Sequence, residues 1–101
     1  MLRHIIMYKY LPEAGGKTKE ENLAHAVELA EAMGRDIPEI THFEILVGAA
    51  RQKDTNYDIA LICDMADFDA LAAYKANPAH KAYGEFSHSV SESRAAIDIE
   101  L

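Results

Sequence analysis

The sequence predicts an α+β fold of the ferredoxin-like type, with a four-stranded antiparallel sheet and its helices on one face. Three observations predict it: the order strand, helix, strand, strand, helix, strand; a polar loop that joins two strand patterns as a hairpin; and capping residues ahead of both helical patterns. Helices on one face leave the other face of the sheet bare, and no further element of the chain can cover it. We therefore expect a second copy of the chain to cover that face.

The first third of the chain predicts a strand, a turn and a helix. Residues 2–10 are rich in aliphatic and aromatic side chains, and the Gly15-Gly16 pair that follows is typical of a turn. Thr18 stands three residues before Glu21, which is the spacing of a capping box at a helix start. Gly34 predicts the end of this helix. The apolar positions between recur at helical spacing and are Leu23, Ala26, Val27, Ala30 and Met33.

The rest of the chain predicts a hairpin, an interrupted helix and a last strand. Residues 40–48 alternate apolar and polar side chains, a polar loop follows, and residues 57–65 form the second strand of the hairpin. Asp67 can cap a short helix, which Asn77-Pro78 interrupts because proline lacks the backbone donor. A new helical turn can start there, with the asparagine as its cap and the proline as its first residue. Residues 94–101 alternate again and predict the final strand.

The 101 residues are expected to form one domain, residues 1–101, because no change in composition divides the chain. Lys and Arg total 10 against 17 Asp and Glu, and the net charge of -7 repels nucleic acid and anionic lipid, so we expect neither as a partner. The N-terminus lacks the pattern of a signal peptide, and no apolar run approaches the roughly 20 residues of a membrane span. Together with Cys63 as the single cysteine, these features favour a cytoplasmic protein.

Motifs for metal, phosphate or nucleophile chemistry are absent or incomplete. The five histidines show neither the HExxH pattern nor a Cys-His cluster, so no metal site is predicted, although ligands from separate strands would not be visible in a sequence. The stretch Gly15 to Thr18 lacks the first glycine of a phosphate-binding loop and indicates a turn. Cys63 falls within a strand, where a small core residue is the simplest interpretation. No cofactor is predicted.

The segment from Tyr74 to His80 carries the most informative chemical pattern. If Asn77 caps the restarted helix, His80 is its third residue, where the positive end of the helix dipole disfavours imidazolium and keeps the ring neutral. A neutral imidazole can accept a proton, and the Tyr74 phenol can donate a hydrogen bond to an oxygen that gains negative charge. The structural alternative is that Tyr74 buries its ring under the helix and His80 bonds an amide or faces water. Spacing alone favours that alternative.

Two further polar residues lie at strand positions. His4 follows the start of an apolar strand, where it is either a hydrogen-bonded core residue or a polar group directed into the interior. Asp58 begins the third strand pattern. It is either a strand-end carboxylate bound to an amide or to His4, or the residue that orients an imidazole.

Four stretches of the chain resemble the stress-responsive dimeric α/β-barrel domain, known as Dabb, of the ferredoxin-like dimeric α+β barrel superfamily. They are "MLRHIIMYKY", "IPEITHFEILVG", "YDIALICDMADFDALAAYKANPAH" and "DIEL", and together they span nearly the whole chain. The most specific element is His4 combined with the D-x-x-x-L-x-x-Y-x-x-x-P-x-H run from Asp67 to His80. The resemblance implies a ferredoxin-like protomer that pairs sheet to sheet as a barrel homodimer.

Members of that family include plant polyketide cyclases, in which a histidine and a tyrosine close a carbon–carbon bond within one molecule without cofactor or metal. By its place in "NPAH", His80 matches that histidine, Tyr74 matches the tyrosine, and His4 matches a pocket histidine of the first strand. Asn77 and Asp58 depart from the cyclases, which have histidine at both positions. The cyclase reaction itself is therefore not carried over to this chain.

Three hypotheses follow for this dimeric small-molecule-binding barrel. In the first it is a cofactor-independent enzyme for a small aromatic or polyketide-like ligand, with His80 and Tyr74 as the catalytic pair and His4 and Asp58 as substrate-binding residues. In the second the same pocket binds a ligand without reaction, as in a stress-associated binding protein. In the third the chain is a structural dimer module and the polar pair is incidental.

Overall fold

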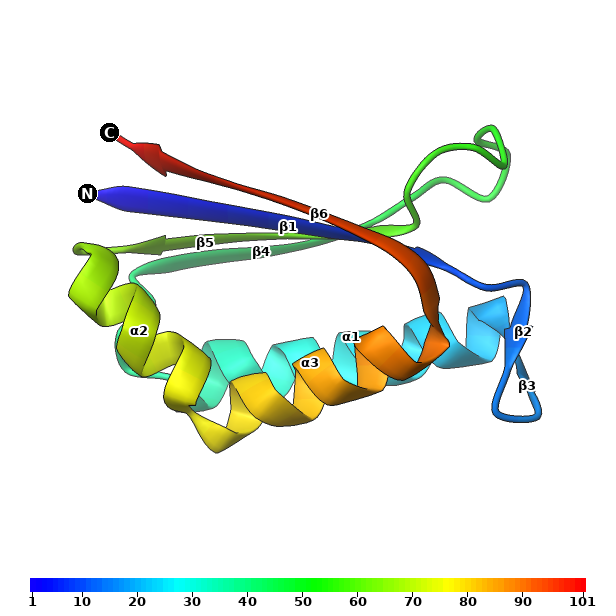
Figure 1. Ribbon diagram of the computed structural model, residues 1–101, viewed down its shortest axis with the longest axis horizontal. Helices are drawn as coiled ribbons and strands as arrows, with labels where there is room; N and C mark the ends of the chain where they lie inside the picture. The colour runs from blue at the N-terminus through cyan, green and yellow to red at the C-terminus, as the bar shows by residue number, and fades with distance from the viewer.

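The computed structural model describes residues 1–101, and its four-stranded antiparallel sheet has the strand order β4-β5-β1-β6 (Figure 1). The bounds of the elements are β1 Leu2–Tyr10, β2 Glu13–Ala14, β3 Lys17–Thr18, α1 Lys19–Asp36, β4 His42–Val47, β5 Ile59–Met65, α2 Phe68–Ala76, α3 Pro78–Val90 and β6 Ser91–Glu100. Apart from the small β2–β3 hairpin, this order confirms the predicted ferredoxin-like arrangement of strands and helices.

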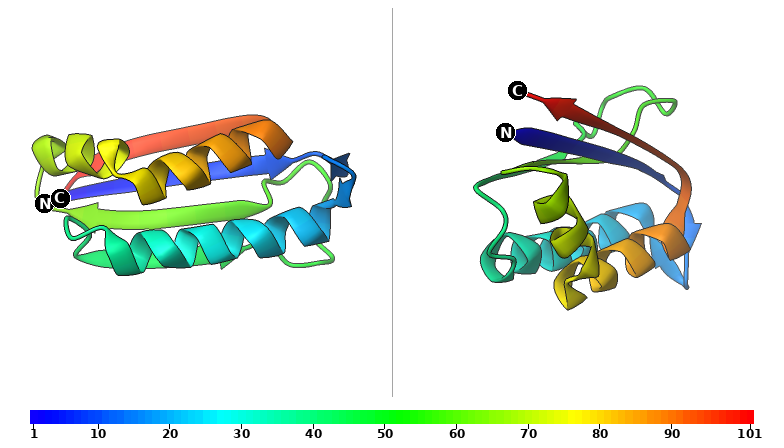
Figure 2. Two further views of the ribbon diagram at one scale, coloured as in Figure 1. Left: turned by 90° about the horizontal axis from the view of Figure 1, so that it is seen from below. Right: turned by 60° about the vertical axis from the view of Figure 1, so that its left-hand side comes forward.

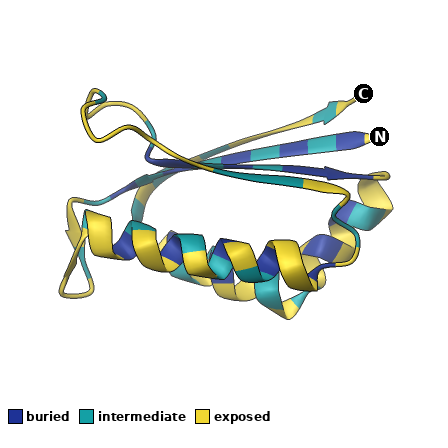
Figure 3. Cartoon of the chain, turned by 180° about the vertical axis from the view of Figure 1, so that it is seen from behind, coloured by how far each residue is buried: buried dark blue, intermediate teal, exposed yellow.

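All three helices lie on one face of the sheet, and no element covers the opposite, outer face (Figures 1 and 2). The two termini lie side by side, where the amide of Leu101 donates to the carbonyl of Met1 at 2.8 Å. In β1, the central strand beside β6, every second residue is buried against the helices. Figure 3 shows the same alternation of buried and half-buried positions along that strand. The inner face of β1 therefore directs its side chains into the core.

The start of α1 was predicted correctly, but its end was not. Thr18 and Glu21 form the reciprocal capping box, in which the Glu21 amide donates to the Thr18 hydroxyl and the Thr18 amide donates to the Glu21 carboxylate. Gly34 lies inside α1, which ends at Asp36. A Cβ at Gly34 would come within 2.8 Å of the Phe43 ring, so this glycine permits close packing of α1 against β4. In the sequence, a glycine needed for close packing cannot be distinguished from a glycine that ends a helix.

Gly15 and Gly16 form the turn of a small hairpin, β2–β3, whose strands the sequence did not predict. Both glycines have positive φ angles, 61° and 77°, as the tight turn between β2 and β3 requires. Each strand has only two residues, which is too short for a pattern of alternation to appear. The hairpin leads the chain from the end of β1 into the start of α1 (Figure 1).

The break at Asn77-Pro78 divides the second helical region into α2 and α3, as predicted. The Asp67 side chain caps α2 by accepting from the Ala70 amide, and the Asn77 side chain caps α3 by accepting from the Ala79 amide, each at 2.9 Å. Tyr74 therefore lies in the last turn of α2 and His80 in the first turn of α3. The break brings side chains of two helices to one corner of the core.

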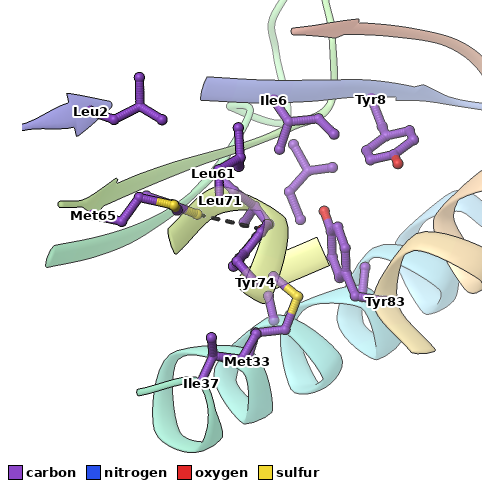
Figure 4. Close-up of a cluster of buried hydrophobic side chains, with 14 of the residues drawn as sticks. Leu2, Ile6, Tyr8, Met33, Ile37, Leu61, Met65, Leu71, Tyr74 and Tyr83 are labelled. Carbon is purple, nitrogen blue, oxygen red and sulfur yellow. Dashed lines mark hydrogen bonds between the residues drawn. The ribbon is translucent and has the colours of Figure 1, made fainter. Parts of the chain in front are cut away.

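The core contains 16 buried hydrophobic residues from the inner face of the sheet and the facing sides of the helices (Figure 4). Cys63 is among them, unpaired and fully buried, as expected of a small core residue. Burial raises the pKa of its thiol to about 11. Five buried residues are polar or charged, namely His4, Asn22, Asp58, Asp64 and Ser87. Two of these, His4 and Asp58, are predicted site residues.

Candidate functional site

Tyr74 and His80 lie against each other at the junction of α2 and α3. Their ring centroids are 4.6 Å apart, with the ring planes tilted by 53°. Tyr74 is only 1% exposed and His80 is half-buried, so neither ring is turned outward to water. His4, on the inner face of β1, places its ring centroid 5.8 Å from that of Tyr74. Three of the four predicted site residues thus form one cluster between the sheet and the helices, called here the histidine cluster.

His4 is paired with an acidic residue that the sequence did not single out. Its Nδ1 lies 2.5 Å from Oδ1 of Asp98, the residue directly opposite on β6. The Asp98 carboxylate therefore holds this imidazole in one orientation. Asp98 occupies an ordinary alternating position in the last strand. Only the register between β1 and β6 connects it with His4.

The His80 side chain has an unsatisfied ring nitrogen. Its Nδ1 is buried and has no hydrogen-bond partner within the protein. Burial lowers the pKa of His80 below its ordinary value. The nearby backbone of Lys75 opposes this shift in part, and the positive charges of Lys75 and Arg94 act in the same direction as burial. The sequence predicted the same direction from the helix dipole, but burial is the main cause. The ring is therefore neutral at neutral pH and can accept a proton.

The Tyr74 hydroxyl points toward β5, where it accepts a hydrogen bond from Cys63 Sγ at 3.6 Å (Figure 4). That bond uses the oxygen as an acceptor and leaves the phenolic proton free to be donated. Burial raises the pKa of Tyr74 well above the ordinary range of a phenol. Tyr74 is therefore a neutral hydrogen-bond donor at neutral pH.

Tyr83 is a further polar residue that sequence reasoning missed. It lies three residues after His80 on the same helix and is 2% exposed, and its hydroxyl has no partner within the protein. Its ring packs edge-on against Tyr8, with the centroids 6.1 Å apart, and Figure 4 shows its oxygen directed toward the sheet. The signal in the sequence was its spacing, because positions i and i+3 of a helix share a face. Among buried side-chain N and O atoms, only His80 Nδ1 and this hydroxyl are unsatisfied.

Asp58 lies away from the histidine cluster. Its Oδ2 accepts from the backbone amide of Tyr10 at 2.8 Å and lies 3.3 Å from Nζ of Lys19. It therefore ties the end of β1 to the start of α1 and does not contact an imidazole. Of the alternatives that the sequence left open, the strand-end carboxylate bound to an amide matches these contacts.

The largest cavity, of about 750 Å³, lies at this other end of the helix–sheet interface. Asp58 and Lys19 line it together with apolar side chains that include Leu23, Val27 and Val47. His4, Tyr74 and His80 do not line it. The predicted site is thus divided between the histidine cluster and a separate space, called here the Asp58 cavity.

The histidine cluster brings together side chains that can exchange protons. A neutral imidazole, a phenol with a free proton and a second imidazole held by a carboxylate face one corner of the core. Such groups can remove a proton and stabilise the negative charge that develops on an oxygen. No three His, Cys, Asp or Glu side chains come together in an arrangement that could hold a metal ion. No helix combines the length and apolar character needed to cross a membrane.

Comparison with known proteins gives a family and a set of similar structures. The model of the Stress Responsive A/B Barrel Domain family matches residues 2–101. No curated protein matches the sequence. A dimeric ferredoxin-like protein of unknown function from Thermobifida fusca is similar with a TM-score of 0.83 and 21% identity, over 99% of this chain and 90% of that one.

Two further solved structures resemble the whole chain. A dimeric protein of unknown function with a ferredoxin-like fold, from Bacteroides fragilis, has a TM-score of 0.79 and 26% identity over 99% of this chain and 95% of that one. An antibiotic biosynthesis monooxygenase has a TM-score of 0.78 and 20% identity over 100% of this chain and 98% of that one. At these levels of identity the likeness concerns the fold.

Proposed function

The chain belongs to the stress responsive A/B barrel domain family, and on that premise we propose that it is a homodimeric small-molecule-binding protein that catalyses proton transfer with His80 and Tyr74. The proposal rests on the contact between the His80 imidazole, which is neutral and has an unsatisfied nitrogen, and the Tyr74 phenol, whose proton is free. The centroids of the two rings are 4.6 Å apart. An antibiotic biosynthesis monooxygenase with the same fold supports small-molecule chemistry on this architecture. We place the protein in the cytoplasm, in keeping with its single cysteine.

The proposed reaction class is removal of a proton from a carbon next to a carbonyl, as in polyketide cyclisation. His80 takes the proton, and the electron pair of the broken C–H bond moves onto the carbonyl oxygen. Tyr74 donates a hydrogen bond to that oxygen, and the dyad of His4 and Asp98 positions the substrate beside it. Every group in this scheme belongs to the chain itself, so the scheme needs no cofactor. The substrate is a small aromatic or polyketide-like compound.

The test of this mechanism is a comparison of His80→Ala and Tyr74→Phe with the native protein on a panel of small carbonyl compounds. Loss of general base catalysis lowers kcat by about 10²- to 10⁴-fold, whereas KM changes little because binding groups remain. His88→Ala is the matched control, since His88 is an exposed histidine of the same helix. Unchanged turnover in both His80 and Tyr74 variants would refute the mechanism.

The dimer is supported by the outer face of the sheet and by the dimeric description of two similar structures. Ile5 of β1 lies opposite Ile62 of β5 on one side and Ile97 of β6 on the other, and Ile97 is 58% exposed. A contiguous apolar surface of this kind is typical of a protein–protein interface. We expect two copies to bury it by packing sheet against sheet.

Ile97→Lys tests this assembly, because it places a charge within the proposed interface. Sedimentation of the native protein should give twice the protomer mass, and the variant should sediment as a monomer at micromolar concentration. Glu85→Lys on the exposed side of α3 makes a larger charge change away from the interface and should remain dimeric. A native protein that sediments as a monomer would overturn the homodimer.

A second candidate function is ligand binding without reaction at the Asp58 cavity. A volume of about 750 Å³ is in the range of small-molecule sites, and the lining combines apolar side chains with four carboxylates and three lysines. Leu23→Trp would fill part of this space. If it abolishes binding of a ligand that His80→Ala still binds with native affinity, the binding function is favoured over the enzyme.

A further inference from the structure

The interface between α1 and the sheet is closed at the start of β4 and open at its end. Phe43, Ile45 and Val47 share the inner face of this strand, because side chains alternate along a strand. Phe43 packs so closely on Gly34 that a Cβ there would come within 2.8 Å of its ring. Val47 lies opposite Ile59, which is 2% exposed, but Val47 itself is 49% exposed. An apolar side chain on the core side of the sheet is thus left without a covering element.

The Asp58 cavity occupies this opening. The start of α1 and the β4–β5 loop lie at the same end of the molecule (Figure 1), and both contribute to the lining. Leu23 and Val27 lie one turn apart on α1, are half-buried, and line the cavity together with Val47. A ligand that covers these three side chains removes apolar surface from water, which contributes roughly 25 cal/mol per Å².

The less exposed charges of the lining are already paired with one another. The lining carries three lysines and four carboxylates, so its charge is nearly balanced. Nζ of Lys19 lies 3.3 Å from Oδ2 of Asp58. Lys9 donates to the backbone carbonyl of Asp54, and its Nζ lies 3.8 Å from Oε1 of Glu92. Neither of these two lysines is free to bind an anion.

The other polar groups of the lining are satisfied or lie in water. Gln52 donates from Nε2 to the carbonyl of Tyr57 at 2.8 Å. The remaining charged side chains, those of Glu20, Lys53 and Asp54, belong to exposed residues. The buried side-chain atoms without a partner belong to other residues, which do not line this cavity. A charged ligand that enters the cavity would therefore lose its hydration without gaining a buried partner.

We propose that the Asp58 cavity binds compact, uncharged, hydrocarbon-like molecules, which it holds by contact with Leu23, Val27 and Val47. The paired charges around these side chains complement a neutral molecule better than an anion or a cation. This ligand class rests on the binding function proposed above for the same cavity. It is independent of proton transfer at the histidine cluster.

Indane, 2-aminoindane and indane-2-carboxylate test the proposal as probes. They share one ring system, and at neutral pH they are neutral, positive and negative. Backbone amide shifts measured by NMR during titration give both the affinity and the location of each probe. Indane should bind saturably, with shifts in residues 19–27 and 47–54, and each charged probe should bind about tenfold more weakly.

Three variants locate the site. Leu23→Trp fills the cavity and should abolish indane binding. Val47→Thr keeps the size of the side chain but adds a hydroxyl that a bound ligand must desolvate, so indane should bind about fivefold more weakly. Leu46→Thr is the matched control, because Leu46 is similarly exposed, at 46%, but points to the opposite face of β4. It should leave indane affinity unchanged.

The proposal is overturned if either charged probe binds as tightly as indane, if indane binding does not saturate, or if Val47→Thr and Leu46→Thr weaken it equally. These failures are distinguishable from failure of the binding function. If a charged probe binds best and Leu23→Trp abolishes its binding, the cavity is a ligand site and the neutral class is wrong. If Leu23→Trp binds indane with native affinity, the cavity is not the site and both proposals are wrong.

Discussion

The two ends of the helix–sheet interface differ in whether their buried polar groups have hydrogen-bond partners. At the Asp58 cavity, Asp58 is bonded to the Tyr10 amide and to Lys19, and the Tyr10 phenol is bonded to Ser87 at 2.8 Å. At the histidine cluster, His80 Nδ1 has no partner. A buried polar group without a partner costs about 1–3 kcal/mol of stability.

This difference separates a structural role from a chemical one. Polar groups that the fold already satisfies stabilise the fold and have little capacity left for a ligand. Groups that the fold leaves unsatisfied are available to a ligand that enters the site, and their cost to stability is typical of functional sites. On this reasoning Asp58 positions β1 and α1, and the histidine cluster is the place to which we assign the proposed chemistry.

Asp58→Ala should have the largest effect on stability. It leaves the Tyr10 amide without its acceptor and Lys19 without its partner, so we expect the free energy of unfolding to fall by about 2–3 kcal/mol. Turnover per folded protein should change less than threefold. Urea unfolding at a fixed protein concentration measures the first quantity, and initial rates below the unfolding transition measure the second. Native stability together with lost turnover would reverse the roles assigned to the two ends.

Tyr10→Phe and Tyr83→Phe form a matched pair, because each removes one buried hydroxyl. Tyr10→Phe leaves the fully buried Ser87 hydroxyl unsatisfied and should cost about 1–2 kcal/mol. Tyr83→Phe removes a hydroxyl that has no partner and should leave stability unchanged or raise it by up to about 1 kcal/mol. Urea unfolding of both variants would show the difference. Equal losses would mean that the Tyr83 hydroxyl is satisfied in the folded protein.

The smallest expected effect is a change in the pH dependence of stability. The folded protein lowers the pKa of His80, so the unfolded chain binds this proton more readily. The contribution of His80 is therefore fully present above the ordinary histidine pKa of about 6.5, and it is lost as the pH falls from there through the folded value. His80→Gln should reduce the loss of unfolding free energy between neutral and mildly acidic pH. An identical pH dependence in the variant would contradict the lowered pKa.

Most of the fold could be predicted from the sequence, because its signals are local. The capping box at Thr18, the cap at Asp67 and the break at Asn77-Pro78 each depend on neighbouring residues, and each is present in the structure. The function of Gly34 depends on a distant contact with Phe43, so its local pattern gave the wrong end for α1. The β2–β3 hairpin was missed because two-residue strands have no periodicity.

The candidate site could be predicted only in part, because it depends on contacts between distant segments. Tyr74 and His80 share one local break, and the sequence pattern connects them directly. The pairing of His4 with Asp98 spans 94 residues and depends on the strand register. Whether Asp58 faces an imidazole or an amide likewise depends on tertiary packing, and the structure places it beside the Tyr10 amide.

The most direct test of the central claim is an NMR titration of the His80 ring in the native protein and in Tyr74→Ala. We expect a midpoint below the ordinary value of about 6.5 in the native protein, because Tyr74 and the core exclude water from the ring. Removal of the tyrosine ring should raise the midpoint toward 6.5. A native midpoint at or above 6.5 that Tyr74→Ala leaves unchanged would contradict a neutral imidazole held with the phenol in one buried site.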